Sequence, residues 1–409
     1  MAISPHVTIP TVSTLTESLQ RLAPLEYAES WDKVGLLVGD HNAPLARAGG
    51  GNVLLTIDLT EDVLDEAIDK KSSAIVAYHP PIFEPLAKVT DITPRQRIIF
   101  RAVQAGIAIY SPHTALDAVP GGVTDWLCEG LSRIEGKTAE NGKVYGDCRA
   151  LVPYAKNSAS QQVKIVTFVP EDDVERVRSA LASAGAGRIG DYNLCSFAVP
   201  GTGTFLGNAG TRPSVGEPER LESVREVRLE MVCGRSSLPL AMELLRSFHP
   251  YEEPAIDVFE LVAKPQRSVG AGRRLVLDRP ATVPELAMRL KKWIGSANVT
   301  YAMPTHVEPG MNEEGKRFSR LGVVPGSGES LSRLARTDGC EVFITGEMKH
   351  HEVLGALHAG MAVILGGHTN TERGYLVRFA DRLRAELLPR GFAGEVLVST
   401  RDRDFLVPV

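Results

Sequence analysis

Short apolar runs alternate with amphipathic stretches in the first and the last thirds of the chain. In the first third, runs typical of strands and stretches of helical periodicity follow one another at residues 52–57, 61–70, 74–77, 95–105 and 107–110. In the last third, the same order gives strands at residues 342–345 and 362–365 and a long amphipathic helix at residues 371–388. Strands that alternate with helices are typical of parallel sheets. The pattern therefore predicts an α/β core made of two βα-rich halves.

The middle of the chain follows a different order. Strand and helix patterns succeed one another, with a hairpin after the first helix, at residues 163–169, 171–184, 191–207, 225–233, 237–247 and 255–262. This βαββαβ order is that of a complete ferredoxin-like unit. The polar residues 156–162 and the Pro/Gly/Arg-rich residues 264–274 flank it as expected linkers. We therefore expect a discontinuous α/β core, residues 1–155 and 268–409, with an inserted ferredoxin-like domain at residues 163–262.

Composition and charge narrow the class of protein. Hydrophobic residues make up 43% of the 409 residues, which is enough to bury the cores of two or three units. The net charge is -5, whereas a protein that binds phosphate backbones usually carries a basic excess. We therefore do not expect nucleic acid as a partner. Small molecules, nucleotides and other proteins stay open as partners.

Cysteine usage and the N-terminal residues bear on the compartment. The five cysteines are widely spaced and form no C-x-x-C pair, which indicates reduced thiols in an intracellular protein. The first residues lack a charged stretch followed by an apolar one, and Glu17 and Glu26 come early, so we expect no secretory signal or mitochondrial presequence. No apolar run is long enough to cross a bilayer. We expect a cytoplasmic protein without a membrane partner, and a mitochondrial or nuclear pool stays open.

Four of the expected strands end in side chains that can bind a metal ion. These side chains are His79; His113 and Asp117; Glu347, His350 and His351; and His368 and Glu372. Ligands of parallel α/β sheets lie outside the carboxyl ends of the strands, so the four clusters could converge. Imidazole with carboxylate suits zinc, iron, manganese or cobalt, and bridging carboxylates suit a two-metal site. Each cluster alone is equally compatible with surface histidines and chance pairs, but the agreement of all four favours a metal site.

Two further segments each have a functional and a structural interpretation. The glycines of Gly326-Ser327-Gly328 precede an expected helix, where backbone N–H groups can bind an anion. A simple helix start explains the same residues. Tyr251-Glu252-Glu253 could line a surface for a small ligand or another subunit, or it could be a loop that caps the middle domain.

Five motifs, in the same order along the chain, resemble those of one family. They are Trp31-Asp32-Lys33-Val34-Gly35-Leu36, Tyr78-His79-Pro80-Pro81-Ile82-Phe83, His113-Thr114-Ala115-Leu116-Asp117, Thr345-Gly346-Glu347 with His350-His351, and Gly367-His368-Thr369-Asn370-Thr371-Glu372. This set resembles the Nif-three family, also known as YbgI/YqfO-like proteins and as GTP cyclohydrolase 1 type 2 homologues. The segment His249-Pro250-Tyr251-Glu252-Glu253-Pro254-Ala255 resembles the PII/CutA-like insertion of the longer members.

The resemblance implies a dinuclear metal site in a ring-shaped homo-oligomer, commonly a hexamer. The metal ligands that it implies are His79, Asp117, His368 and Glu372. Many bacterial members have two adjacent histidines where this chain has Tyr78-His79, and the Tyr-His-Pro-Pro form is similar to that of the eukaryotic branch. A phenol ligates poorly unless it is deprotonated, so we expect one or two divalent ions of zinc, iron or manganese.

These observations together suggest a metal-dependent hydrolase. A bound metal ion lowers the pKa of its water and so supplies hydroxide at neutral pH, and His113 or His350 would transfer protons. Opening of the GTP ring is implied only by the family's name. The alternative is a non-enzymatic metal-binding protein with a regulatory or interaction role, because the family name derives from a protein interaction. A Rossmann nucleotide-binding protein is excluded, because no G-x-G-x-x-G follows an early strand.

Overall fold

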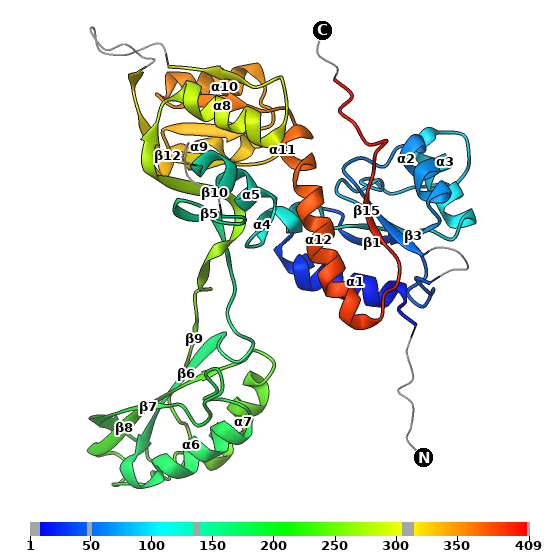
Figure 1. The fold of residues 1–409 in the computed structure, drawn as a ribbon. Helices are drawn as coiled ribbons and strands as arrows, with labels where there is room; N and C mark the ends of the chain where they lie inside the picture. Colours follow the sequence, from blue (N-terminus) through cyan, green and yellow to red (C-terminus); the bar gives the residue numbers. More distant parts are fainter. Residues whose placement is uncertain (1–8, 47–50, 134–139, 305–314, 407–409) are drawn as a thin grey trace. The chain divides into compact units, whose positions relative to one another are not determined.

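The computed structural model describes residues 9–46, 51–133, 140–304 and 315–406. The chain forms two compact units, which Figure 1 draws as ribbons. The core unit consists of residues 1–154 and 266–409, and the middle unit of residues 155–265. Three sheets are formed by the described residues, two in the core unit and one in the middle unit, so the fold is mixed α/β. No helix in the described part of the chain has the length and apolarity needed to span a membrane.

The first sheet of the core unit has the strand order β1-β4-β3-β2-β15. Its strands and the helices between them are β1 (Gly35–Val38), β2 (Asn52–Thr56), α2 (Glu61–Asp69), β3 (Ser72–Ala77), α3 (Pro94–Gln104), β4 (Ala108–Ser111) and β15 (Val396–Val398). Strands β15, β2, β3 and β4 are parallel, and β1 pairs antiparallel with β4. Every residue of β3 is buried, as expected for a central strand covered on both faces.

The second sheet of the core unit has the order β11-β14-β13-β12-β10-β5. Its strands and helices are β5 (Gly146–Ala155), β10 (Pro265–Ala281), α8 (Val283–Ile294), β11 (Thr300–Ala302), β12 (Phe318–Val323), α9 (Glu329–Thr337), β13 (Val342–Thr345), α10 (His350–His358) and β14 (Ala362–Leu365). Strands β12, β13 and β14 are parallel, which aligns their carboxyl ends at one edge.

Residues 264–274 do not form the expected linker. Most of them belong to strand β10, which lies between β12 and β5 in the second sheet. Gly270 allows a close approach to β5, because a Cβ atom there would lie 2.0 Å from the carbonyl oxygen of Val152. The glycines that suggested a flexible segment are therefore positions of tight strand packing.

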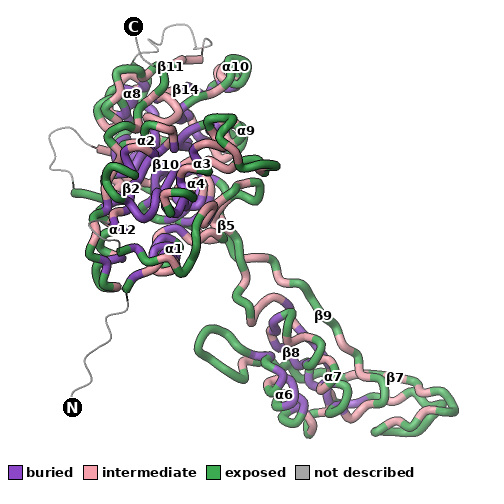
Figure 2. The backbone as a smooth tube through the Cα atoms, turned by 90° about the vertical axis from the view of Figure 1, so that its right-hand side faces the viewer, coloured by how far each residue is buried: buried purple, intermediate pink, exposed green. Residues whose placement is uncertain are grey.

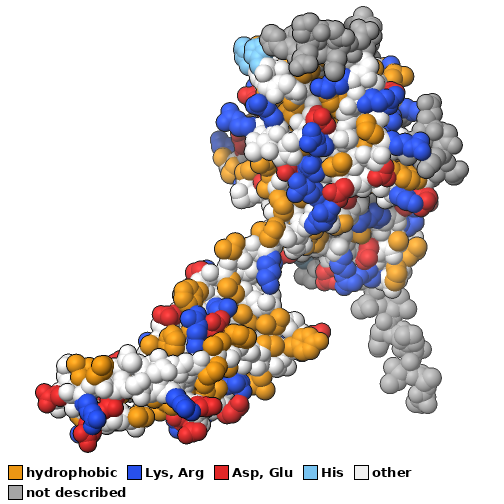
Figure 3. Space-filling view, turned by 90° about the vertical axis from the view of Figure 1, so that its left-hand side faces the viewer, with side chains coloured by type: hydrophobic (Ala, Val, Ile, Leu, Met, Phe, Trp, Pro, Cys, Tyr) orange, Lys and Arg blue, Asp and Glu red, His pale blue; other side chains and the backbone are white. Residues whose placement is uncertain are grey.

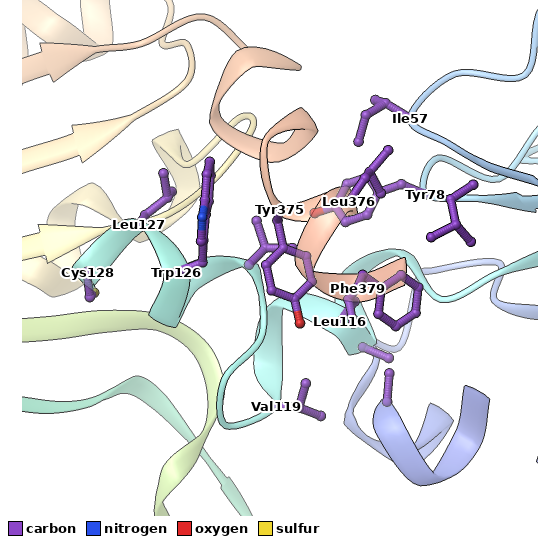
Figure 4. Packing of buried hydrophobic residues seen from close by; sticks show 14 of the residues in the cluster. Ile57, Tyr78, Leu116, Val119, Trp126, Leu127, Cys128, Tyr375, Leu376 and Phe379 are labelled. Atoms are coloured by element: carbon purple, nitrogen blue, oxygen red, sulfur yellow. The ribbon is translucent and has the colours of Figure 1, made fainter. Parts of the chain in front are cut away.

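One hydrophobic cluster joins the two halves of the core unit, and it includes residues of both sheets. The helices α1 (Val12–Leu22), α4 (His113–Ala118), α5 (Val123–Ser132) and α12 (Tyr375–Leu387) contribute to it. Figure 4 shows Tyr375 and Phe379 of α12 packed beside Leu116 and Val119. The two sheets consequently share a core, and the ends of their strands are fixed relative to each other.

The single helix expected at residues 371–388 is in fact two helices. The short α11 (Asn370–Arg373) and the longer α12 are separated at Gly374. A Cβ atom at Gly374 would lie 2.7 Å from ring carbons of Trp126, so the glycine lets the indole pack against the chain. Periodicity in the sequence does not reveal this contact, because Trp126 is distant along the chain.

The middle unit has an antiparallel sheet of order β7-β8-β6-β9. Its elements are β6 (Val163–Pro170), α6 (Val174–Ser183), β7 (Phe197–Leu206), β8 (Leu221–Cys233), α7 (Leu238–Phe248) and β9 (Ile256–Glu260). A separate hydrophobic cluster lies between the sheet and the two helices, and Figure 2 shows the buried residues there and largely exposed residues along β7. Figure 3 shows hydrophobic and acidic side chains exposed on this unit.

The prediction of a hairpin within residues 191–207 is wrong, because these residues contain only the first of its two strands. Strand β7 pairs with β8 from Phe197 opposite Glu230 to Leu206 opposite Leu221. The connection between the two strands therefore covers residues 207–220, and the glycines of β7 lie inside a strand. Alternation of apolar and polar residues is weak in β7, since most of its residues are exposed.

Candidate metal centre

A cavity of about 610 Å³ lies in the core unit where the carboxyl ends of strands from both sheets converge. Most of the residues that line it follow β3, β4, β12 and β14, and they include His79, His113, Asp117, His368 and Glu372; others precede β1 or belong to β10. This position follows the general rule that ligands of parallel α/β sheets lie beyond the carboxyl ends of the strands. Five of the six expected site residues therefore share one cavity.

His79 is held in place by backbone and side-chain hydrogen bonds. Its backbone N–H donates to the carbonyl oxygen of Ile57 at 3.0 Å, which extends the pairing of β2 and β3 beyond the strands. Its Nδ1 lies 2.9 Å from Oδ1 of Asp58. Its Nε2 faces Glu372 and lies 3.5 Å from Oε2. Because Asp58 engages Nδ1, Nε2 is the nitrogen left to bind a ligand in the cavity.

His368 repeats this arrangement from the other half of the unit. It follows β14, and α11 places Glu372 one turn later. Its Nδ1 lies 2.8 Å from Oε1 of Glu347, and its Nε2 lies 3.6 Å from Oε1 of Glu372. Each imidazole thus has one nitrogen beside an orienting carboxylate and the other directed at Glu372.

The residues at this point fit a divalent cation. Ligand atoms of His79, His368 and Glu372 all lie within 4.8 Å of one another. The Glu372 side chain is only 3% exposed, and its Oε2 makes no hydrogen bond to any described residue. Burying a carboxylate oxygen without a partner is costly, and a cation between the two imidazoles would remove that cost. Two imidazoles with a carboxylate are a ligand set that zinc and iron accept.

Gly326 provides the space beside these three side chains. Its φ of +59° lies in the left-handed region, and a Cβ atom would lie 2.5 Å from Oε1 of Glu372 and 3.1 Å from Nε2 of His368. The N–H groups of Gly326 and Gly328 donate to the hydroxyls of Thr371 and Thr345. These two amides are therefore engaged within the protein, and the structural role of Gly326 is to keep the centre open.

Asp117 lines the cavity but is bound to a different partner. Its Oδ1 accepts a hydrogen bond of 2.5 Å from the hydroxyl of Tyr78, which is buried, whereas Asp117 itself is partly buried. Burial raises the pKa of Asp117, although the Tyr78 bond acts in the opposite direction. Burial and the nearby charge of Asp117 raise the pKa of Tyr78. Among the described residues, the group of three convergent ligand atoms does not include Asp117.

The electrostatics of His79 follow from its two carboxylates. Burial by itself lowers the pKa of the imidazole, but Asp58 and Glu372 stabilise the protonated form and raise the pKa to about 10. Burial raises the pKa of Asp58, but the hydrogen bond with His79 and the nearby charges of His79, Arg373 and His368 together hold the pKa below its ordinary value. In the absence of a metal ion, His79 therefore carries a proton at neutral pH.

The two histidines expected to transfer protons are in different environments. His113 lines the cavity, its ring centroid lies 5.5 Å from that of His79, and its Nδ1 lies 2.7 Å from Oδ1 of Asp32. Its φ of +32° is unusual for a residue with a side chain. His350 begins α10, is exposed beside His351, and is not among the residues that line the cavity.

The sequence did not reveal the roles that three residues have in the centre. Asp58 directly follows an expected strand, as the histidine clusters do, so its position was a usable signal. Glu347 stands inside one of the motifs, but nothing local indicates that it pairs with His368. The sequence indicated Gly326 only as a candidate donor of a backbone N–H group to an anion. Its importance depends on side chains that approach it from α11.

The fold and this site define an α/β protein with a candidate metal centre between two sheets. A family model described as Duf34/NIF3 (NGG1p interacting factor 3) matches residues 10–404, nearly the whole chain. The chain therefore belongs to the Duf34/NIF3 family, which confirms the resemblance drawn from the five motifs.

Similar proteins come from bacteria and animals. A protein of Halalkalibacterium halodurans named GTP cyclohydrolase 1 type 2 homolog is 33% identical over 391 residues, 96% of this chain and 97% of the relative. NIF3-like protein 1 of Bos taurus is 30% identical over 397 residues, 96% of this chain and 91% of the relative. The crystal structure of a Bacillus cereus protein related to NIF3 has 29% identity and a TM-score of 0.63, and covers 98% of this chain and 100% of that chain.

Proposed function

We propose that this protein binds a divalent metal ion, zinc, iron or manganese, through His79, His368 and Glu372, and uses it to hydrolyse a small molecule. The observation that carries the proposal is the buried carboxylate of Glu372: its Oε2 accepts no hydrogen bond and lies 3.5 Å from Nε2 of His79, and its Oε1 lies 3.6 Å from Nε2 of His368. Bound there, the ion would activate water and polarise an electrophilic substrate atom. The binding of the ion and the transfer of protons are assigned to the protein's own side chains.

Asp117 is proposed as a ligand only for a second ion. Its Oδ1 is engaged by the Tyr78 hydroxyl, whereas the carboxylate of Glu372 is open to the first ion. A second ion at Asp117 would have to compete with this short hydrogen bond or use the remaining oxygen. We therefore propose one firmly held ion, with a second one bound more weakly.

His113 is proposed to transfer the proton. Asp32 holds its Nδ1, so its Nε2 is the nitrogen available in the cavity, near His79. Hydrogen bonds from His113 and Thr114 keep the pKa of Asp32 below its ordinary value despite burial, so Asp32 remains an anion that orients the imidazole. His350 is exposed on α10 and does not line the cavity, so we do not propose it for this proton transfer.

The size of the cavity favours an enzyme over a protein that only stores metal. About 610 Å³ falls within the range of small-molecule pockets, roughly 300–1,000 Å³. The partly exposed rings of Trp31 and Phe83 line it with centroids 6.0 Å apart, beside the candidate metal ligands. The name of the Halalkalibacterium halodurans relative suggests nucleotides, GTP among them, as the first substrates to test.

The test is a screen of purified protein against nucleotides and phosphoesters. Four samples are compared: metal-loaded protein, chelator-treated protein, Glu372→Gln, and His351→Ala as the matched surface control. We expect turnover only in the loaded protein and in His351→Ala. Stoichiometric metal without turnover on any substrate would favour the alternative, a non-enzymatic metal-binding regulatory or interaction protein. Loaded protein that retains no metal after dialysis would refute the proposal altogether.

For the middle unit, we propose a ferredoxin-like, PII/CutA-like insertion at residues 163–262. The order of its strands and helices and the sheet order β7-β8-β6-β9 support it. Excision of this segment and closure of the flanks should leave a folded, metal-binding core. We also propose a homo-oligomer, a hexamer by family resemblance, for which light scattering should give several times the 44.2 kDa of one chain. An insoluble deletion would contradict the first proposal, and a monomer the second.

A further inference from the structure

The middle unit contains a second cavity, of about 350 Å³, that shares no residue with the candidate metal centre. Its walls include three aromatic rings and three carboxylates, from Phe168, Phe205, Tyr251, Glu226, Glu252 and Glu253. The residues that line the cavity come from β6, β7, β8, the connection between β7 and β8, and the segment before β9. A cavity of this size can take a small molecule.

Glu226 is fixed within this cavity with one oxygen engaged. Its Oε1 accepts a 2.7 Å hydrogen bond from the Tyr251 hydroxyl. Its Oε2 lies against Gly203, where a Cβ atom would be only 2.0 Å away. The backbone N–H of Tyr251 donates to Nδ1 of His249, and Nε2 of His249 lies 3.0 Å from the carbonyl oxygen of Phe168. The carboxylate and two of the rings are therefore held by one hydrogen-bonded group.

The negative charge of the cavity is not compensated as it is elsewhere in the unit. Glu230, four residues further along β8, pairs with Lys164 and Arg228 at 2.8 Å each. Glu226, Glu252 and Glu253 have no ion pair within 4.0 Å among the described residues. Arg212 lines the cavity, but its bond to Glu252 runs from its backbone N–H.

We propose that this cavity binds a small organic cation, an ammonium or guanidinium group carried on apolar carbon. Aromatic faces attract such cations, and the free oxygen of Glu226 would accept a charge-assisted hydrogen bond. A bare divalent metal ion does not fit, because it needs convergent ligand atoms and the described residues bring such atoms together only at His79, His368 and Glu372. The inference does not depend on the proposed function, since its residues all belong to the middle unit.

The test is calorimetric titration of the full chain with 2-phenylethylammonium, phenylguanidinium and phenyltrimethylammonium. The neutral 2-phenylethanol and the anionic 3-phenylpropionate are the matched probes. We expect cations to bind at one site per chain and the other two probes to bind much more weakly. Equal binding of the neutral alcohol would overturn the proposal, and so would the absence of binding by all three cations at about 10 mM, where even a Kd near 1 mM is detectable.

Two pairs of variants locate the binding. Glu226→Gln should weaken cation binding about 10-fold or more, whereas Glu230→Gln on the same strand should not change it. Gly203→Ala should weaken it because the new methyl group meets the Glu226 carboxylate, whereas Gly201→Ala, where a Cβ atom meets nothing within 4 Å, should not. Circular dichroism verifies that each variant is folded. If Glu226→Gln and Gly203→Ala both bind cations as the parent chain does, the cavity is not the site.

Discussion

The two halves of the core unit each place a histidine beside Glu372 and contribute one carboxylate to the same cavity, Asp117 or Glu372, but the two carboxylates have different partners. In the N-terminal half, Asp117 is bound by the hydroxyl of Tyr78. In the C-terminal half, Glu372 accepts no hydrogen bond at Oε2, and each of its two oxygens faces one imidazole. The partner that each carboxylate already has decides which of them is available to a cation.

The two orienting carboxylates differ in their exposure to solvent. Asp58 and Glu347 each follow an interior strand, but the Asp58 side chain is 24% exposed and that of Glu347 is 57% exposed. A hydrogen bond to a more buried carboxylate is less weakened by solvent. We therefore expect His79 to depend on its partner more strongly than His368 does.

The sharpest test of the comparison replaces each of these two carboxyl groups by an amide in turn. Glu372→Gln should lower metal affinity more than about 100-fold, beyond the 10–100-fold typical of residues that only orient a ligand. Asp117→Asn, the same chemical change, should leave the first ion bound. Competition with a chelator followed by elemental analysis gives both values. If the two variants lose metal equally, the distinction between the two halves is wrong.

A test of shape rather than charge uses glycines with the same backbone conformation. Gly326→Ala puts a methyl group 2.5 Å from Glu372, and overpacking of this kind costs about 1–3 kcal/mol, or roughly 5- to 150-fold in metal affinity. Gly295→Ala shares the positive φ but meets nothing within 4 Å, so it controls for backbone strain. Its metal affinity should equal that of the parent chain. Unchanged affinity in Gly326→Ala would show that the ion lies elsewhere.

The difference between the orienting carboxylates can be measured directly. Asp58→Asn should weaken metal binding about 10–100-fold, because Nδ1 of His79 loses its anionic partner. Glu347→Gln should weaken it by less, about 10-fold at most, since the exposed carboxylate is already screened by solvent. Titration of both variants with the same ion and chelator decides the order. A larger loss in Glu347→Gln would reverse the comparison.

The dependence of metal affinity on pH tests the protonation of His79 in the metal-free protein. Because the pKa of His79 is raised to about 10 in the metal-free protein, an ion must displace its proton at neutral pH. Affinity should therefore rise as pH rises, by up to about tenfold per pH unit for one displaced proton. Asp58→Asn should flatten this dependence, since Asp58 helps to hold the proton. Affinity that is independent of pH between about 6.5 and 8.5 would contradict the protonated state of His79.

The local part of this molecule was predictable from the sequence. The strands at residues 342–345 and 362–365 are found as expected, because continuous apolar runs bounded by turn residues leave little choice. The proximity of the clusters after β3 and β4 also followed from a local rule, since parallel strands of one sheet align their carboxyl ends, whereas the approach of the cluster after β14 depends on how the two sheets pack. Family resemblance added the candidate ligands that spacing alone could not select.

The parts that escaped prediction depend on contacts between distant segments. Strand β10 was mistaken for a linker because its neighbour β5 lies more than a hundred residues earlier. The break at Gly374 depends on Trp126, and the engagement of Asp117 depends on Tyr78. In each case a side chain or strand from another element changes what the local pattern favours. Asp58 is an exception, since its position directly after the expected strand at residues 52–57 could have indicated that it lies near the site.

The pairing of β5 with β10 has a mechanical consequence. The chain leaves the core unit at the end of β5 and returns at the start of β10, and these two strands are neighbours in one sheet. Tension applied to the two ends of the polypeptide would be carried by the core unit, because the hydrogen bonds between β5 and β10 transmit the force directly from one strand to the other. The middle unit, which lies between these strands in the sequence, would not be stretched. The middle unit would bear load only after these strands had separated. Forced extension should therefore rupture the core unit first and the middle unit second, whichever of them is the weaker.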